Sequence, residues 1–394
     1  MPGRIAFRGP DARVYTVNQD GSEERPLTST RSSFRYNGRT PLVRESWPSW
    51  SPDGRRIAYS QVLPEVDGTL RFEVRVADAR SGESQSVFVN PHGSSTIGGR
   101  VPHYVQWSSD GAHVAFLAAT PEGMGLYVAP DLRHVREVVR QAPIYFAWAP
   151  DRPGLLVHAR ERHMLIVPTR PDVPLAVEAV SAVHRLSSWA PDGSGMAYIW
   201  DRPGDRLALY KADSTGRDPR EITRVRAFAG FLWSPTAQAF AVGDDQDPTM
   251  PFYTRTRVVR TDGVEWAVPL ERVLAFFWSP DGSKLACLTL GGSEGTVGLV
   301  VLNVQQGGSR ESVRVEFAPS WGVLSLLPFF DQYAISHRIW SPDSRYVVVP
   351  GYIAGMHERP SQGDEDMHIY VIDSEGLEPP KAVAQGVLAF WSPV

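Results

Sequence analysis

Short runs of alternating apolar and polar residues recur along the whole chain, and turn-forming residues separate them. Arg56–Tyr59, His113–Phe116 and Lys284–Cys287 exemplify a first run, and Val74–Val76 and Leu126–Val128 exemplify the run that follows it. Runs of this length, rich in β-branched and aromatic residues and bounded by Gly, Pro, Asp and Ser, predict β-strands. No stretch shows the periodicity of an amphipathic helix. The pattern therefore predicts an all-β protein built from many short strands.

One phrase precedes the first strand of each group. It reads Trp-Ser-Pro-Asp-Gly in its fullest form, as at Trp50–Gly54 and Trp278–Gly282. The eight tryptophans that open the phrase, called here the repeat tryptophans, are Trp50, Trp107, Trp148, Trp189, Trp233, Trp278, Trp340 and Trp391. Their spacing of 41 to 62 residues, with four predicted strands per interval, is typical of β-propeller blades. Because the phrase recurs once per blade, we expect its Trp and Asp side chains to be structural.

The two ends of the chain complement each other. Leu388–Pro393 has the sequence that precedes a first strand, and Arg4–Phe7 has the sequence that follows the turn. We therefore expect the C-terminal strand to complete the N-terminal blade and close the ring. The prediction is a single eight-bladed β-propeller domain over residues 1–394, with four antiparallel strands per blade. Blade 1 comprises residues 388–394 and 1–28, and blades 2 to 8 open near residues 50, 107, 148, 189, 233, 278 and 340.

The phrase and the Arg-Ile-Ala-Tyr run at Arg56–Tyr59 together resemble the repeat of TolB-type, WD40-like β-propellers. They are also similar to the blades of dipeptidyl-peptidase and prolyl-oligopeptidase propellers. The resemblance covers nearly the whole chain and implies the blade fold, with no particular activity. The signal peptide and N-terminal domain of periplasmic TolB proteins have no counterpart in this sequence, and neither does the α/β-hydrolase domain of the peptidases.

Composition narrows the classes of function. Forty basic and 44 acidic residues leave a net charge of −4, without the basic excess of a nucleic-acid-binding protein. The single cysteine, Cys287, excludes a disulfide framework and a cysteine-rich metal site. The most apolar stretch, Phe317–Phe330, is too short and too interrupted by Gly and Pro to cross a bilayer. Because Met1–Gly9 lacks an apolar leader, we expect a cytoplasmic protein, and we expect it to be monomeric.

Candidate catalytic residues have a structural interpretation in each case. Gly291–Gly295 matches the Gly-x-Ser-x-Gly nucleophile pattern around Ser293, but it lies between two predicted strands of one blade and not at a strand-to-helix elbow. Cys287 lies within an apolar strand, as a small core residue does. We therefore expect no catalytic residue among them.

Three histidines fall near the starts of innermost strands, where propeller lyases and lactonases place metal ligands. His103, His184 and His337 belong to predicted blades 3, 5 and 8, and such wide separation makes convergence within about 2 Å of one metal difficult. Acidic groups at Asp364–Asp366 and Asp244–Asp247 lack the alternating ligand spacing of a calcium loop, so they predict solvated loop charge. We expect neither a metal nor another cofactor.

Loop length is distributed unevenly around the ring. Blades 3 to 6 are short, whereas blades 7, 8, 1 and 2 carry long links that open on one face of a propeller. These links are Thr28–Ser46, Gln61–Leu70, Val89–Val101, Ala318–Ser336 and Gly351–Asp366. Long loops on a rigid scaffold are frequent binding sites. Ala318–Ser336 is so rich in large apolar residues that it either covers the channel as a plug or presents an apolar anchor.

These observations predict a non-enzymatic interaction scaffold that binds a protein or peptide across the long-loop face of blades 7, 8, 1 and 2. Aromatic anchors within a polar, charged rim are typical of such interfaces. The predicted binding residues are Arg35, Trp321, Phe330, Tyr333, His337, His357, Asp364 and Asp366. The alternative is an enzyme or small-ligand binder at the channel mouth, of metal-assisted lyase or hydrolase type. Convergence of His103, His337 and acidic residues in one pocket would favour that alternative.

Overall fold

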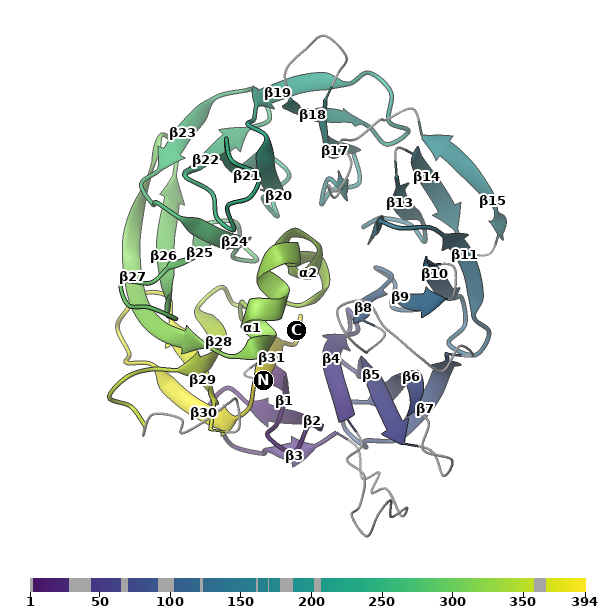
Figure 1. Ribbon diagram of the computed structural model, residues 1–394, viewed down its shortest axis with the longest axis horizontal. Coiled ribbons are helices and arrows are strands. Elements are labelled where there is room, and N and C mark those ends of the chain that lie inside the picture. The colour runs from purple at the N-terminus through teal and green to yellow at the C-terminus, as the bar shows by residue number, and fades with distance from the viewer. Residues whose placement is uncertain are drawn as a thin grey trace.

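The fold is a ring of radial β-sheets around a common centre (Figure 1). The computed structural model describes residues 3–27, 44–64, 70–90, 103–120, 123–160, 162–168, 170–177, 187–201, 207–357 and 366–394. Within these residues strands dominate, and the expected all-β propeller class is confirmed. No helix in the described part of the chain is long and apolar enough to span a membrane.

Six of the sheets have four antiparallel strands each. The first two contain β31 (Leu388–Trp391), β1 (Arg4–Arg8), β2 (Val14–Asn18) and β3 (Arg25–Pro26), then β4 (Arg44–Trp50), β5 (Arg56–Pro64), β6 (Leu70–Asp78) and β7 (Ser84–Val89). The next two contain β8 (His103–Trp107), β9 (Val114–Thr120), β10 (Gly123–Ala129) and β11 (Arg136–Arg140), then β12 (Ile144–Trp148), β13 (Leu155–Ala159), β14 (Arg162–Val167) and β15 (Arg170–Val177). The last two contain β16 (Ser188–Trp189), β17 (Gly195–Trp200), β18 (Ala208–Asp213) and β19 (Arg220–Arg224), then β20 (Phe228–Trp233), β21 (Ala239–Asp245), β22 (Arg255–Arg260) and β23 (Glu265–Val268).

A seventh sheet has seven strands. They are β24 (Val273–Trp278), β25 (Lys284–Leu290), β26 (Val297–Gln305), β27 (Gly308–Pro319), β28 (Tyr346–Tyr352), β29 (His368–Asp373) and β30 (Lys381–Gln385). This sheet consists of a first group, β24 to β27, and a second group, β28 to β30. The two groups are joined because Ala318 and Pro319 at the end of β27 pair with Tyr352 and Gly351 of β28. Trp340 forms an isolated antiparallel bridge with Val347 of β28, on the inner side of the second group.

The C-terminal strand pairs with the N-terminal one. β31 runs antiparallel to β1, with Ile5 opposite Trp391 and Phe7 opposite Ala389. On the other side of β31, the Trp50 indole Nε1 of β4 donates to the carbonyl oxygen of Phe390 at 3.2 Å. The last strand of the chain is therefore held between the first sheet and the next one.

The repeated phrase forms the tight turn that its residues predict. In the first copy the Ser51 hydroxyl accepts from the Arg56 backbone N–H at 2.9 Å and donates to Asp53 at 2.5 Å. The Asp53 carboxylate also accepts from the Arg55 N–H, and Gly54 has a φ of 66°. The same Ser–Asp pair occurs at Ser108–Asp110, Ser279–Asp281 and Ser341–Asp343. Each side chain bonds its own turn, so the aspartates have the structural role that we expected.

The repeat tryptophans link neighbouring inner strands. Besides Trp50, four of them donate their indole N–H to the backbone carbonyl of the residue that precedes the repeat tryptophan of the adjacent sheet. The pairs are Trp107 with Ser49 at 2.9 Å, Trp148 with Gln106 at 3.2 Å, Trp278 with Leu232 at 3.3 Å and Trp340 with Phe277 at 3.0 Å. One such bond contributes about 0.5–1.5 kcal/mol. Repetition around the ring makes it a systematic connection between sheets.

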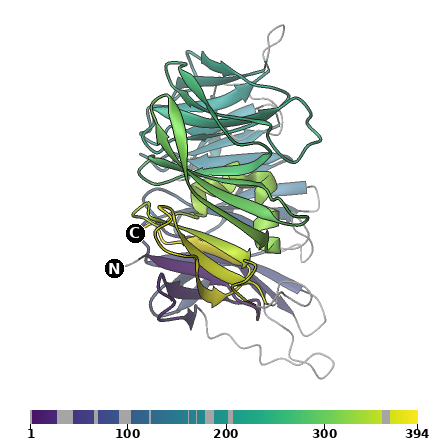
Figure 2. The ribbon, with the colours of Figure 1, turned by 90° about the vertical axis from the view of Figure 1, so that its left-hand side faces the viewer.

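The expectation of a chain without helices is wrong for Ala318–Ser336. This link forms α1 (Trp321–Leu326), the 3-10 turn η1 (Leu327–Phe329) and α2 (Phe330–Ser336). Helices of six and seven residues are too short to show a clear periodicity or to be stable in isolation, so tertiary packing must support them. Contacts of α2 with β8, β12, β20 and β24 place it at the centre of the ring (Figure 1). From the side, the two termini lie at one face, and the helices are displaced toward the other (Figure 2).

Candidate functional site: the plug and the channel mouth

Residues 321–336, called here the plug, are held in the ring by aromatic contacts. Tyr333 stacks on Trp47 with ring centroids 4.7 Å apart and meets Tyr104 edge-on at 5.5 Å. Phe330 meets Phe276 edge-on at 4.8 Å, on the other side of α2. Phe330 and Tyr333 are each only 2% exposed. The link is thus a plug, one of the two forms that its composition predicts.

Two inner strands are distorted to reach the plug. The pairing register shifts between Ser46 and Ser49 in β4 and between His103 and Gln106 in β8. Within these bulges Trp47 and Tyr104 have φ values of 56° and 63°, a region that costs an L-residue roughly 1–2 kcal/mol. A bulge re-aims a side chain, and here both aromatic rings contact Tyr333.

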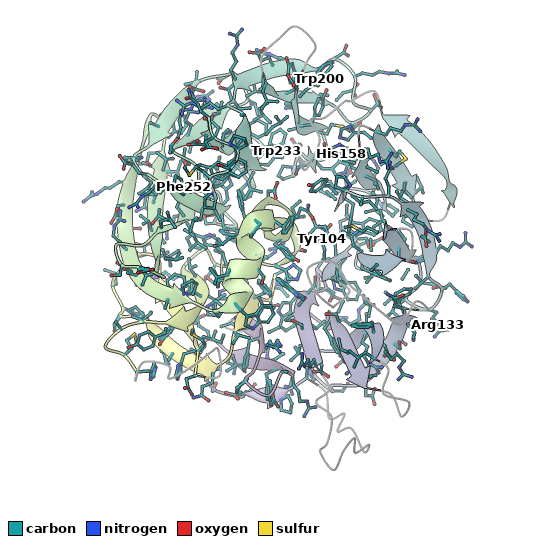
Figure 3. All side chains as sticks on the ribbon, viewed as in Figure 1. Tyr104, Arg133, His158, Trp200, Trp233 and Phe252 are labelled. Atoms are coloured by element: carbon teal, nitrogen blue, oxygen red, sulfur yellow. The ribbon has the colours of Figure 1, made fainter. Side chains whose placement is uncertain are left out.

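Tyr104 also forms a polar connection with α2. Its hydroxyl donates to the Gln332 carbonyl oxygen at 3.1 Å and also lies 3.3 Å from the Phe146 carbonyl oxygen, and the Gln106 side-chain amide donates to it. Burial raises the pKa of this phenol well above its usual value. It therefore stays a neutral donor, and Figure 3 shows Tyr104 beside α2 at the centre of the ring.

The predicted binding residues separate into three groups. Trp321, Phe330, Tyr333 and His337 meet at the plug. Trp321 is half-buried beneath the Arg8 guanidinium, which lies 5.2 Å from its ring centre. His337 is buried against Phe390, with ring centroids 4.6 Å apart, and its Nδ1 is 2.6 Å from the Ser336 hydroxyl. The burial of Phe330 and Tyr333 assigns them a packing role in this conformation, and contact with a partner stays a prediction.

The second group lies beside β29, and the third lies outside the described residues. His357 and Asp366 are exposed, and the His357 ring stacks on His368 at 3.8 Å. The third group consists of Arg35 and Asp364. Most residues of the long loops of blades 1 and 2 also lie outside the described residues. Partner binding by any of these residues stays a prediction.

Of the three histidines, only His337 has a side chain that the structure describes. His103 begins β8, where its backbone pairs with Leu117, and His184 lies outside the described residues. His337 is packed among Trp47, Tyr333 and Phe390. In the described ranges no group of three or more His, Cys, Asp or Glu side chains could hold a metal ion.

Asp244 corrects the expectation of solvated charge in the second acidic group. It ends β21 with no exposed surface, and its carboxylate accepts from Arg255 at 2.6 Å and from Arg257 at 2.8 Å. Arg226 lies 3.6 Å away. Buried carboxylates require such partners, because desolvation of an unpaired charge is expensive. Arg255 and Arg257 follow Asp244 by 11 and 13 residues, on the other strand of the hairpin. The sequence alone does not indicate this pairing, because it depends on the strand register.

The two candidate nucleophiles lie in the β-hairpin and strand positions that the sequence predicts, and the absence of catalysis stays a prediction. Ser293 lies in the turn between β25 and β26, where its N–H donates to Glu316 at 3.1 Å. Cys287 is fully buried in β25, and burial raises the pKa of its thiol far above the usual value. A thiol in this state is not a nucleophile at neutral pH.

The opposite end of the ring centre is hollow. A cavity of about 400 Å³ is lined by Ile335 and Arg338 and, among others, by Trp148, Trp189 and Trp233. A smaller cavity of about 90 Å³ adjoins it and shares Ile335 and Arg338. Between them the two cavities, called here the channel mouth, are lined by all eight repeat tryptophans. The sequence suggested a small-ligand site at the channel mouth only as an alternative, through His103 and His337, and it did not indicate that the repeat tryptophans form the wall.

Several solved structures share the fold at low sequence identity. A eukaryotic initiation factor matches with a TM-score of 0.59 and 13% identity, over 100% of this chain and 98% of that chain. Dihydro-heme d1 dehydrogenase NirN matches with a TM-score of 0.57 and 15% identity, over 98% of this chain and 74% of that chain. The β-propeller domain of the trilobed protease from Pyrococcus furiosus matches with a TM-score of 0.51 and 11% identity, over 87% of this chain and 98% of that chain. Identities this low establish the β-propeller fold alone.

The TolB-type character of the chain appears in its repeat phrase. TolB from Acinetobacter baumannii is also similar, with a TM-score of 0.40 and 16% identity, over 78% of this chain and 65% of that chain. No protein-family model matches the sequence. The likeness to TolB-type propellers therefore rests on the repeat phrase, and the structure establishes the β-propeller fold.

Proposed function

We propose that this protein is a non-enzymatic interaction scaffold that binds a protein or peptide partner across the long-loop face of blades 7, 8, 1 and 2. The observation that carries the proposal is the plug, which fills the ring centre with aromatic side chains yet leaves Leu324 and Phe329 52% and 43% exposed. Apolar side chains exposed on a rigid, packed support are typical of interaction surfaces.

The distribution of other exposed apolar side chains supports this face. In a propeller, the links between second and third strands and those between successive blades open on one side. Seven of the large exposed hydrophobic residues in the described part of the chain fall in these links or at their edges. One of them, Ile335, lines the channel mouth, and the other six are Leu70, Val89, Met250, Leu324, Phe329 and Met356. Isolated exposed hydrophobic residues are ordinary, but their concentration in the links of one face supports a docking surface there.

The proposal assumes a single eight-bladed domain closed by its C-terminal strand. Pairing of β31 with β1 supports the closure, and the bridge between Trp340 and Val347 supports a separate eighth blade within the seven-stranded sheet. A closed ring is stiff, so it holds loops from distant parts of the sequence in fixed relative positions. Closure also makes blades 8 and 1 neighbours, which the proposed surface requires.

Charged residues would form the rim of this surface. Asp366 and His357 are exposed beside β29, and we propose that Arg35 and Asp364 join them, with Trp321 at the plug. Rim charges act mainly on the association rate and on its salt dependence. Replacing Arg35, Asp364 or Asp366 should therefore slow association at low salt and leave thermal stability unchanged.

A matched pair of double variants tests the placement. Leu324→Ser with Phe329→Ser changes the proposed surface, whereas Val264→Ser with Leu377→Ser changes exposed apolar residues in turns between third and fourth strands, on the other face. In quantitative affinity capture from the source organism's lysate, proteins retained by the unaltered protein should be lost with the first double variant and kept with the second. Hydrogen exchange with a captured partner should then protect residues 321–329. Equal capture by both variants, or protection confined to the repeat turns, would contradict the proposal.

A further inference from the structure

The geometry points to a binding site for a small organic carboxylate at the channel mouth, with Arg338 as the anion-binding group and the repeat tryptophans and prolines as an apolar wall. This site lies at the other end of the ring centre from the proposed partner surface. The two proposals can therefore fail independently.

Arg338 occupies a position that surrounds it with protein without closing it off from water. It follows the buried His337, and its backbone is fixed because the Trp391 N–H donates to its carbonyl oxygen at 2.8 Å. The residue is exposed, yet burial among the surrounding blades lowers the pKa of its guanidinium. Its side chain borders both cavities of the channel mouth.

Arg338 has no charged partner within the described ranges. No ion pair or side-chain hydrogen bond joins it to another described residue, and no Asp or Glu is among the described residues that line either cavity. Most other buried or half-buried charges described here have partners, as Asp244 and Asp373 do. Arginine stays protonated in proteins, and a cation within low-dielectric walls attracts anions strongly. Its planar fork of donors matches a carboxylate bidentately.

The walls suit an apolar and planar body. Pro150, Pro191, Pro235 and Pro280 alternate with repeat tryptophans around the larger cavity, and Ile335 adds an aliphatic surface. Its volume of about 400 Å³ falls within the range of small-ligand pockets. A mainly apolar cavity with one convergent charge is a common arrangement for ligand binding, in which the charge orients the ligand.

Three repeat tryptophans lack the indole link between blades. The indole N–H groups of Trp189, Trp233 and Trp391 have no hydrogen-bond partner among the described residues, unlike those of the five linked repeat tryptophans. Their counterparts in the regular pattern would be the carbonyl groups of Ala147, Ser188 and Ile339, and all three of these residues line the larger cavity. Trp189 and Trp233 also line that cavity themselves, so we expect the ligand body to lie against these two rings.

The test compares a carboxylate with its neutral isostere. Indole-3-carboxylate and indole-3-carboxamide are titrated into the full chain by calorimetry, and ligand-observed NMR checks weak binding. The carboxylate should bind at least about tenfold more tightly, because a charge-assisted bond contributes about 1.5–3 kcal/mol. Arg338→Gln should remove this preference, and Arg338→Lys should retain part of it. Arg133→Gln, an exposed arginine at the outer edge of the ring (Figure 3), is the control and should change nothing.

Further arms separate the sources of the carboxylate and the failures of the proposal. A short peptide that ends in Phe, free or amidated, is titrated in the same way. A free peptide that binds more tightly than indole-3-carboxylate and loses affinity on amidation would support the site, with a polypeptide C-terminus as its ligand. Equal binding of acid and amide, an unchanged Arg338→Gln variant, or absence of binding up to millimolar concentration would overturn the proposal. Inorganic phosphate that binds as tightly as the carboxylate would overturn the role of the apolar wall.

Discussion

The two ends of the ring centre are built from different kinds of residue. The plug end depends on one link that occurs once in the chain, and it is packed by Phe330 and Tyr333 against aromatic side chains. The channel mouth is built from a phrase that recurs in every blade, and it stays hollow. Repetition thus produces a symmetric wall, whereas the unrepeated link breaks the symmetry and places single residues such as Arg338 at defined positions.

The difference also concerns energy. At the plug end, Trp47 and Tyr104 adopt strained backbone conformations to contact α2, and the aromatic packing offsets that cost. At the mouth, the Ser–Asp turn and the tryptophan link recur in several blades, as at Ser51–Asp53 and Trp107. We therefore expect the unrepeated residues to form specific interactions and the repeated residues to stabilise the fold.

The largest expected effect comes from removing residues 388–394, which breaks both ends at once. The edge of β1 would lose its partner strand, and the Trp50 indole would lose its acceptor. Loss of the buried Trp391 alone costs about 3–5 kcal/mol. We expect aggregation or a strongly lowered melting temperature by calorimetry and sedimentation. Removal of Val394 alone is the control, and a full truncation that melts like the intact protein would contradict the closed ring.

A pair of adjacent phenylalanines compares packing with exposure at the plug end. Phe330→Ala removes a ring that is 2% exposed, and it should lower the free energy of unfolding by about 3–5 kcal/mol. Phe329→Ala removes one that is 43% exposed, and it should change stability by less than about 0.5 kcal/mol. Chemical denaturation measures both. Similar losses for the two variants would show that the plug is not packed as described.

A pair of tryptophans makes the equivalent comparison at the mouth. Trp340→Phe removes an N–H that donates to the Phe277 carbonyl oxygen at 3.0 Å, whereas Trp233→Phe removes one without a partner among the described residues. Both lose similar apolar area, so the difference isolates the hydrogen bond. Trp340→Phe should cost about 1 kcal/mol more in unfolding free energy. A larger loss for Trp233→Phe would mean that its indole N–H has an acceptor in solution.

The sequence predicted the repeated part of this structure far better than the unrepeated part. The strands, the Ser–Asp turns and the complementary ends follow from local residue preferences that recur, so each copy supports the others. The plug helices could not be predicted in this way, because Gly322, Pro328 and several aromatic residues oppose helix formation. Only burial in the ring centre stabilises these helices. Arg338 had no signal either, since its significance depends on the absence of nearby carboxylates in three dimensions.

The smallest expected effect concerns pH at the outer part of the long-loop face. The pKa of His368 is lowered from 6.5 by desolvation and then by the neighbouring His357 ring. The unfolded chain therefore binds a proton more readily than the folded protein, so stability should fall as pH decreases below about 6.5. His357→Gln removes the charge repulsion together with the stacked ring, so the His368 pKa should move back toward 6.5. NMR titration of the imidazole C–H signals measures this directly, and a His368 that titrates at or above 6.5 in the intact protein would contradict the described stacking.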